Sequence, residues 1–166
     1  MTRELKLVIV GAGRLALSHR PKRSDIGRLR DMGVTHVVTL LAEREGANEV
    51  GESVRSAGLT WTWCPLANGR PPDAQVTQTL RPVLAELAGL LREGAALLVH
   101  CSAGIHRTGM FGYALLRQVG LEPAAARAKL IELRAVTAEG VGEERLAWGD
   151  SLLDQGGGGT APAEDR

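Results

Sequence analysis

Apolar residues are spaced along this chain so that short buried strands alternate with amphipathic helices. Runs of apolar and β-branched side chains predict strands, whereas apolar positions that recur every three or four residues predict helices. The predicted strands are 5–10, 14–18, 36–41, 59–64 and 95–100. The predicted helices are 24–32, 48–57, 73–92, 108–119, 123–133 and 143–153. This order favours an α/β fold, with a mainly parallel sheet flanked by helices on both faces.

Glycine, proline and capping residues mark the ends of these elements. Gly11-Ala12-Gly13 predicts a hairpin-like turn between the first two strands. Ser24 and Gly33 predict the start and the end of the first helix, and Pro65 ends the fourth strand. The Gly-rich polar segment 155–166 predicts a disordered tail, so residues 1–154 are expected to form one domain.

The segment from Gly11 to Ala16 also fits the spacing of a dinucleotide-binding fingerprint, G-x-G-x-x-A. That fingerprint requires a helix that begins at the glycines. Here Pro21 stops any helix after about one turn, because a proline inside a helix removes a hydrogen bond and clashes with the preceding turn. A dinucleotide-binding fold is therefore excluded.

The composition is that of an ordinary globular protein. Hydrophobic residues make up 44% of the 166 residues and charged residues 23%, which suffices for a substantial core. No stretch approaches the roughly 20 apolar residues of a membrane span, and the N-terminus lacks the features of a signal peptide. The chain has two cysteines, and no structural disulfide is expected. We therefore expect a monomer in the cytoplasm that does not bind membranes.

Basic residues are concentrated near the N-terminus, although the net charge is only +1. Glu4 and Asp25 are the acidic residues among the first thirty, which include eight basic ones: Arg3, Lys6, Arg14, Arg20, Lys22, Arg23, Arg28 and Arg30. This asymmetry is compatible with a solvated surface. It is also compatible with a basic rim that favours a polyanionic substrate.

The candidate chemistry lies between the fifth predicted strand and the following helix, in the run from His100 to Thr108. A loop in this position can point several backbone N–H groups inward and bind an anion at the helix N-terminus. Such a positive field would hold Cys101 as the nucleophilic thiolate. Arg107 adds a planar fork of donors that matches two phosphate oxygens. The alternative is a buried structural cysteine followed by an arginine on a helix face.

The run resembles the His-Cys-x5-Arg-Ser/Thr signature of the protein-tyrosine and dual-specificity phosphatase superfamily. Residues 25–64, with the strand that reaches Pro65-Leu66, are similar to the cyclin-dependent kinase-associated phosphatase type. The resemblance implies a dual-specificity phosphatase-like α/β fold and no metal or cofactor. It also implies hydrolysis of a phosphomonoester through a phosphocysteine on Cys101.

The resemblance leaves the substrate open. A phosphoprotein is expected from the dual-specificity type. The alternatives are a non-protein polyanion, such as an inositol polyphosphate or pyrophosphate, a nucleotide or an RNA phosphate end, and an inactive module that only binds phosphate.

Roles in this site follow from the resemblance, residue by residue. Cys101 is the nucleophile, Arg107 binds the equatorial phosphate oxygens, and Thr108 gives its hydroxyl to the sulfur. His100 is expected to orient the loop through hydrogen bonds. The remaining loop residues are expected to bind the substrate phosphate: Ser102, Ala103, Gly104, Ile105 and His106.

The general acid is the first departure from the family pattern. Family members carry an aspartate on a loop about thirty residues before the cysteine, and it protonates the leaving oxygen. In this chain the loop is 65–73, and the prolines align Asn68, a candidate substrate-binding residue, with the acid position. The loop's one carboxylate is Asp73, which can act as the acid or cap the next helix. A good leaving group would need no strong acid.

His106 is the second departure, because tyrosine phosphatases usually have Gly there and dual-specificity enzymes Ser. The sequence His106-Arg107-Thr108-Gly109 is similar to the plant and fungal atypical dual-specificity group, whose members act on inositol pyrophosphates. A protonated His106 can bind a second phosphate, or it can simply face solvent. The Gln that positions water in tyrosine-specific members has no match near 141–143.

Cys64 is the second cysteine and ends another predicted strand. If that strand neighbours the strand of Cys101, the two cysteines can form a protective disulfide. The alternative is a plain buried cysteine.

Overall fold

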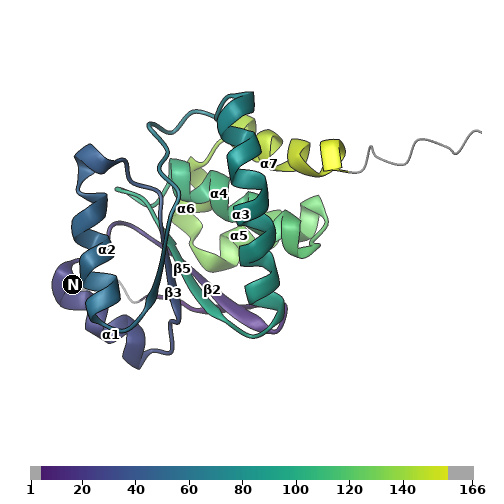
Figure 1. Cartoon of the computed structure of the whole chain (residues 1–166). Coiled ribbons are helices and arrows are strands. Elements are labelled where there is room, and N and C mark those ends of the chain that lie inside the picture. The colour runs from purple at the N-terminus through teal and green to yellow at the C-terminus, as the bar shows by residue number, and fades with distance from the viewer. Residues whose placement is uncertain (1–4, 157–166) are drawn as a thin grey trace, which may run out of the picture.

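The computed structural model describes residues 5–156, which form a five-stranded sheet between two layers of helices (Figure 1). The strands are β1 (Val8–Val10), β2 (Gly13–Ser18), β3 (His36–Thr39), β4 (Thr60–Trp63) and β5 (Ala96–His100). The helices are α1 (Ile26–Asp31), α2 (Ala47–Ser56), α3 (Ala74–Arg92), α4 (His106–Val119), α5 (Pro123–Leu133), α6 (Ala135–Gly140) and α7 (Glu143–Gly156). Two 3₁₀ turns, η1 (Arg23–Asp25) and η2 (Glu43–Glu45), precede α1 and α2.

The strand order is β1-β2-β5-β3-β4, with β1 antiparallel to β2 and the remaining neighbours parallel. This confirms the prediction of a mainly parallel sheet and of a hairpin at the first two strands. The register places Ser18 opposite His100 and Thr39 opposite His100. The three central strands therefore end at the same edge, where ligands bind in parallel α/β sheets.

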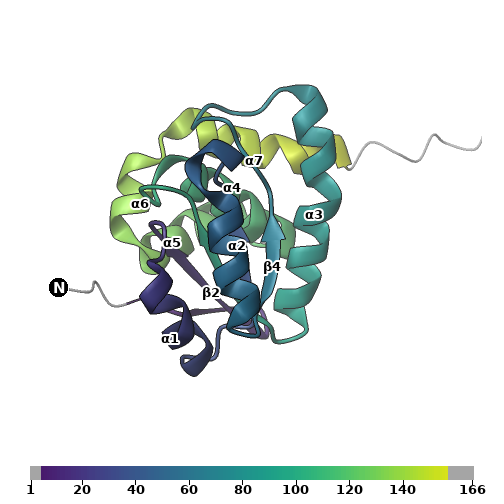
Figure 2. The same cartoon turned by 60° about the vertical axis from the view of Figure 1, so that its left-hand side comes forward.

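Helices cover both faces of the sheet, as the sequence predicted. α1 and α2 lie on one face, and α3 to α7 lie on the other (Figures 1 and 2). Along β5, Leu97 and Val99 belong to the apolar cluster under the larger layer, and Leu98 belongs to the cluster under α1 and α2. Every residue of β5 is buried, because a central strand has helices on both sides.

Helix α4 lies at the centre of the larger layer and is buried from residue 107 to 116. Two glycines let it approach its neighbours closely. A Cβ at Gly109 would lie 2.7 Å from the Val141 side chain, and one at Gly112 would lie 3.1 Å from the Leu17 side chain. The loop that follows β5 is therefore held between a central strand and a central helix.

Three local predictions were wrong. Ser24 does not cap the first helix, because the chain forms η1 there and no side chain caps it or α1. Helix α6 was not predicted, since its six residues are too few to show a helical period. Helix α7 continues to Gly156, so residues 155 and 156 are helical, and the rest of the predicted tail, 157–166, lies outside the described residues. Within 5–156, no helix is both long and apolar enough to cross a bilayer.

Candidate active site

The loop between β5 and α4 surrounds the sulfur of Cys101, which is 3% exposed. Its Sγ accepts hydrogen bonds from the Gly104 N–H at 3.2 Å and from the Thr108 hydroxyl at 3.0 Å. Both donors favour negative charge on the sulfur, because a hydrogen bond to an ionised acceptor is stronger than one to a neutral acceptor. The structure thus brings Cys101, Gly104 and Thr108 together as the sequence predicted.

The outer side of the loop is fixed by hydrogen bonds to its carbonyl oxygens. The Arg20 N–H donates to the Ser102 carbonyl at 2.9 Å. The Gly104 carbonyl accepts from Arg134 at 2.7 Å and from the Thr137 hydroxyl at 2.5 Å. In a trans peptide the C=O and N–H groups point in opposite directions, so the N–H groups that follow these carbonyls point to the inner side. Inward N–H groups form the concave surface that binds an anion.

Gly104 is required by the path of this loop. Its φ of +73° lies in the left-handed region, which favours glycine. A Cβ at this position would lie 2.5 Å from the backbone nitrogen of His19, which follows β2. The loop therefore packs against backbone here and leaves no room for a side chain.

Arg107 is paired with Glu45, a residue that the sequence analysis did not identify. Nη1 donates to Oε2 of Glu45 at 2.7 Å, and Nη2 donates to Oε1 at 2.9 Å. Nη1 also donates to the Leu66 carbonyl at 3.1 Å. Both hydrogens of Nη1 are therefore used. The Nε–H and the second Nη2–H remain on the other edge of the guanidinium as a fork for two oxygens of an anion.

Glu45 is itself held in place by η2. Its Oε2 accepts the Ala42 N–H at 2.7 Å, and its carbonyl accepts a hydrogen bond from Arg20. The hydrogen bonds from Arg107 lower the pKa of Glu45 to about 2, so its carboxylate is ionised at neutral pH. The same pair raises the pKa of Arg107. The one feature of the sequence that could have indicated Glu45 is a carboxylate soon after the strand β3, which neighbours β5. This feature is a weak indication, because acidic residues are common in loops.

His100 is completely buried behind the loop. Its Nδ1 lies 3.0 Å from the Cys101 carbonyl oxygen, and its Nε2 lies 2.8 Å from the Thr39 hydroxyl. Burial lowers the pKa of His100 to about 4, so the ring is neutral at physiological pH. His100 therefore contacts the backbone of the nucleophile and not the space in front of it, which is consistent with the orienting role expected for it.

Loop 65–73 lies beside the N-terminus of α4. The Gly69 carbonyl accepts a hydrogen bond from Arg145, and a Cβ at Gly69 would lie 3.0 Å from the Cβ of His106. His106 is exposed. The Leu66 carbonyl accepts a hydrogen bond from Arg107, so loop 65–73 contacts the signature run at His106 and Arg107, the first two residues of α4.

Asn68 and Asp73 both form local hydrogen bonds within this loop. Oδ1 of Asn68 accepts the Arg70 N–H at 2.9 Å, which stabilises a turn. Oδ1 of Asp73 accepts the Val76 N–H at 2.9 Å, so Asp73 is the N-cap of α3. Asp73 is exposed. The cap is thus present, and the role of Asp73 as general acid stays a prediction.

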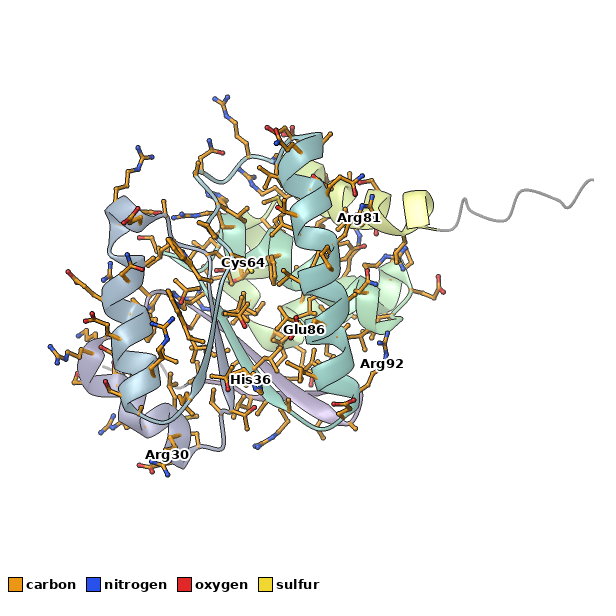
Figure 3. All side chains as sticks on the ribbon, in the orientation of Figure 1. Arg30, His36, Cys64, Arg81, Glu86 and Arg92 are labelled. Atoms are coloured by element: carbon orange, nitrogen blue, oxygen red, sulfur yellow. The ribbon has the colours of Figure 1, made fainter. Side chains whose placement is uncertain are left out.

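Cys64 does not lie on a strand next to that of Cys101. Cys64 directly follows β4, which pairs with β3, and β3 separates β4 from β5. Two strand spacings amount to about 9.6 Å, whereas the Cα atoms of a disulfide lie within about 6.8 Å. Burial raises the pKa of Cys64 to about 12, so it stays a thiol. Figure 3 shows Cys64 at the opposite end of the sheet from His36. A disulfide with Cys101 would require the backbone to move.

Three of the basic residues of the first thirty do not form one rim around the loop: Arg20, Lys22 and Arg23. Arg20 turns toward the Glu45 segment, and Lys22 and Arg23 line a cleft of about 590 Å³ between η1, α1 and α2. Glu49 and Glu52 line the opposite side of that cleft. In the part of the chain that the structure describes, no three His, Cys, Asp or Glu side chains gather as a metal site would require.

Comparisons with known proteins agree with this geometry. The family model PTP-SAK, described as a Swiss Army Knife protein with a DSP-PTPase phosphatase domain, matches residues 4–145. No curated protein sequence gives a match.

Solved structures share the fold at low sequence identity. Kinase-associated phosphatase, KAP, with its catalytic-site cysteine replaced by serine, is 16% identical with a TM-score of 0.71, over 96% of this chain and 100% of that chain. PTPMT1 in complex with PI(5)P is 18% identical with a TM-score of 0.70, over 90% of this chain and 98% of that one. Human DUSP28 is 20% identical with a TM-score of 0.68, over 90% and 96%. These likenesses confirm the predicted phosphatase-like α/β fold.

Proposed function

The chain belongs to the DSP-PTPase family of phosphatase domains, and from this we propose that it hydrolyses phosphate monoesters through a phosphocysteine on Cys101. One observation carries the proposal. The Cys101 sulfur accepts hydrogen bonds from Gly104 and Thr108, while Glu45 holds Arg107 with one donor edge left for phosphate oxygens. A nucleophile, an anion-binding loop and a phosphate clamp thus lie within one short segment.

The reaction proceeds in two steps that both use this loop. The sulfur of Cys101 attacks phosphorus in line, the S–P bond forms, and the bond to the leaving oxygen breaks. Inward N–H groups and the free edge of Arg107 stabilise the equatorial oxygens, where charge develops. Water then attacks the phosphocysteine, and the S–P bond breaks to release inorganic phosphate. The Thr108 hydroxyl donates to the sulfur as it leaves.

We propose a phosphoprotein as the substrate, as in the dual-specificity type. The exposed position of Asp73 at the edge of loop 65–73 supports this reading, because an exposed carboxylate is free to exchange protons with a leaving hydroxyl.

A second candidate is a non-protein polyanion, and one observation favours it. Asp73 caps α3, and the position aligned with the acid holds Asn68, which stabilises a turn. A phosphoanhydride in an inositol pyrophosphate, a nucleotide or an RNA end leaves without strong acid assistance. The relative PTPMT1 was solved in complex with PI(5)P, a phosphorylated non-protein ligand.

The intact pairing of Cys101 with Thr108 and of Arg107 with Glu45 argues against an inactive phosphate-binding module. We further propose that the chain acts as a cytoplasmic monomer, since a catalytic thiolate needs a reducing compartment. It would need no metal, because neither step calls for a Lewis acid beyond the loop donors.

The test is hydrolysis of p-nitrophenyl phosphate in excess chelator by the wild type, by Cys101→Ser and by Cys64→Ala. We expect Cys101→Ser to lose turnover and to keep binding phosphate or sulfate, because the hydroxyl is a poor nucleophile and the loop is unchanged. Cys64→Ala is the matched control and should retain activity. Rapid acid quench with labelled substrate should trap phosphate on the wild type and on Cys64→Ala, and none on Cys101→Ser. Turnover by Cys101→Ser would refute the mechanism, and a panel of phosphopeptides, inositol phosphates, nucleotides and RNA ends decides the substrate.

A further inference from the structure

A chain of hydrogen bonds runs from the edge of the sheet to the backbone of the nucleophile. The Trp61 indole N–H donates to the Thr39 hydroxyl oxygen at 2.8 Å. The Thr39 hydroxyl lies 2.8 Å from Nε2 of His100, and Nδ1 of His100 lies 3.0 Å from the Cys101 carbonyl oxygen. The sheet order explains this path, because β4, β3 and β5, which carry these residues, are consecutive strands.

The direction of each hydrogen bond follows from what its groups are able to donate. A neutral imidazole has one N–H, and a carbonyl oxygen only accepts, so the hydrogen of His100 is on Nδ1. Nε2 is then an acceptor, and the Thr39 hydroxyl must donate to it. The Thr39 oxygen in turn accepts the indole N–H of Trp61. The donor and the acceptor of each hydrogen bond in this series are therefore fixed, and the direction of one hydrogen bond cannot change without changing the others.

We propose that Thr39 and Trp61 are positioning residues for the phosphatase reaction, which fix the tautomer of His100 and, through it, the orientation of the Cys101–Ser102 peptide. The Cys101 carbonyl points to the His100 ring. The N–H of Ser102 in the same trans peptide therefore points the opposite way, toward the inner side of the loop. That N–H is then available to the sulfur and to a phosphate oxygen. The inference rests on the proposed role of Cys101.

The packing around Trp61 allows its role as a hydrogen-bond donor to be tested separately from its role in packing. Its ring stacks on Trp63 with centroids 5.8 Å apart, and the Arg55 guanidinium lies 4.8 Å above it. Gly51 of α2 leaves room for this ring, since a Cβ there would lie 2.7 Å from it. A phenyl ring at position 61 retains an aromatic face for both contacts and loses the N–H that reaches Thr39 together with the five-membered ring of the indole. Trp63→Phe removes the same ring volume without removing a donor to Thr39.

The test compares four variants in a Cys64→Ala background, where Cys101 is the remaining thiol. Thr39→Val removes the hydroxyl from a similar volume, and Thr39→Ser restores it. Trp61→Phe removes the indole donor in the chain. Trp63→Phe is its matched control on the same strand, because the Trp63 N–H donates to the Leu41 carbonyl instead. Each variant is measured for kcat and KM, for thermal unfolding, and for the pH profile of Cys101 alkylation by iodoacetamide.

We expect Thr39→Val to lower kcat about tenfold, with little change in KM, because the buried His100 ring and the half-buried Trp61 indole lose their partner and the peptide loses its orientation. Alkylation of Cys101 in this variant should also be slower, since less hydrogen bonding reaches the sulfur. Trp61→Phe should lower kcat by about a third as much as Thr39→Val does, on a logarithmic scale. Thr39→Ser and Trp63→Phe should stay within about twofold of the background.

A Thr39→Val protein that melts earlier but keeps the background kcat and alkylation profile overturns the proposal, because Thr39 is then only part of the core. If Thr39→Val does not fold, the comparison of Trp61→Phe with Trp63→Phe tests the proposal. Equal kcat and equal alkylation profiles of these two variants overturn the proposal. The alkylation of Cys101 can be measured without substrate turnover, so it tests the proposal independently of the phosphatase mechanism. A failure of the phosphocysteine mechanism would appear separately, as activity of Cys101→Ser.

Discussion

Glu45 offers a sharp test of the site, because it contacts the signature arginine from outside the signature. Its two carboxylate oxygens accept hydrogen bonds from Arg107 at 2.7 and 2.9 Å. Glu45→Gln keeps the shape, removes the charge, and places an amide N–H against a guanidinium donor. A hydrogen bond to a charged group contributes about 1.5–3 kcal/mol, and one of the two is lost outright.

In the proposed mechanism this loss should appear mainly in the transition state, where the other edge of Arg107 would bind equatorial oxygens. The Leu66 carbonyl still holds Nη1 at 3.1 Å, so the arginine is loosened and not released. A misplacement of about 1 Å costs up to about 100-fold in rate. We therefore expect Glu45→Gln to lower kcat/KM by about 10- to 100-fold, which corresponds to about 1.4–2.7 kcal/mol of transition-state stabilisation.

The assay is kcat/KM for an aryl phosphate, with the affinity for vanadate and the thermal midpoint measured on the same protein. Glu43→Gln is the matched control, because Glu43 is an exposed carboxylate in the same 3₁₀ turn. Wild-type kcat/KM and vanadate affinity in Glu45→Gln would refute the reasoning, since Arg107 would then need no partner to hold its fork.

The pH dependence of stability follows from the same pair. The pKa of Glu45 is lowered from its ordinary value of 4.5 to about 2, first of all by the hydrogen bond from Arg107. A depressed carboxyl pKa contributes stability that is fully present above 4.5 and is lost as the pH falls through about 2. Wild type and Glu45→Gln should therefore converge in stability in strong acid, and their difference should be constant between about pH 6 and 8.

The remaining predictions concern the phosphate clamp, the acid and the loop glycine. Arg107→Lys should lose at least about 100-fold in kcat/KM, nearly as much as Arg107→Ala, because lysine keeps the charge without the fork; a lysine variant within a few-fold of wild type would make Arg107 a point charge. Asp73→Asn keeps a good helix cap and removes the acid, so on a phosphoprotein-type substrate it should slow an alkyl phosphate by about 100-fold and an aryl phosphate much less. Equal small effects would favour the anhydride substrates. Gly104→Ala should unfold at least about 2 kcal/mol more easily, measured by denaturant titration, because its left-handed backbone and close contact both oppose a Cβ.

What the sequence could predict was largely what is local in the chain. Cys101, Arg107 and Thr108 are seven residues apart at most, and their strand and helix are visible as adjacent apolar patterns. Glu45 is separated from Arg107 by 62 positions, and only the order of strands in the sheet brings them together. The same holds for Thr39, which is 61 positions from His100.

The question that the sequence left open about Cys64 has the same origin. Its strand follows β3 in the chain, and no local pattern states that β3 pairs with β5 on its other side. Helix α6 was missed because six residues give less than two turns of periodicity. Asp73 could be seen to have two roles, and the hydrogen bond to the Val76 N–H establishes one of them.

The attachment of the catalytic loop to the central strand and helix has a consequence for how the protein opens. Residues 107–116 of α4 and all of β5 are buried, so amide hydrogens there should exchange with solvent only when the whole domain unfolds. Loop 65–73 and residues 22–25 lie near the surface and should exchange through small local openings. Insertions and substitutions at positions 67–70 and 22–25 can then alter which substrates are accepted, while the cooperative unit that carries Cys101 and Arg107 stays intact.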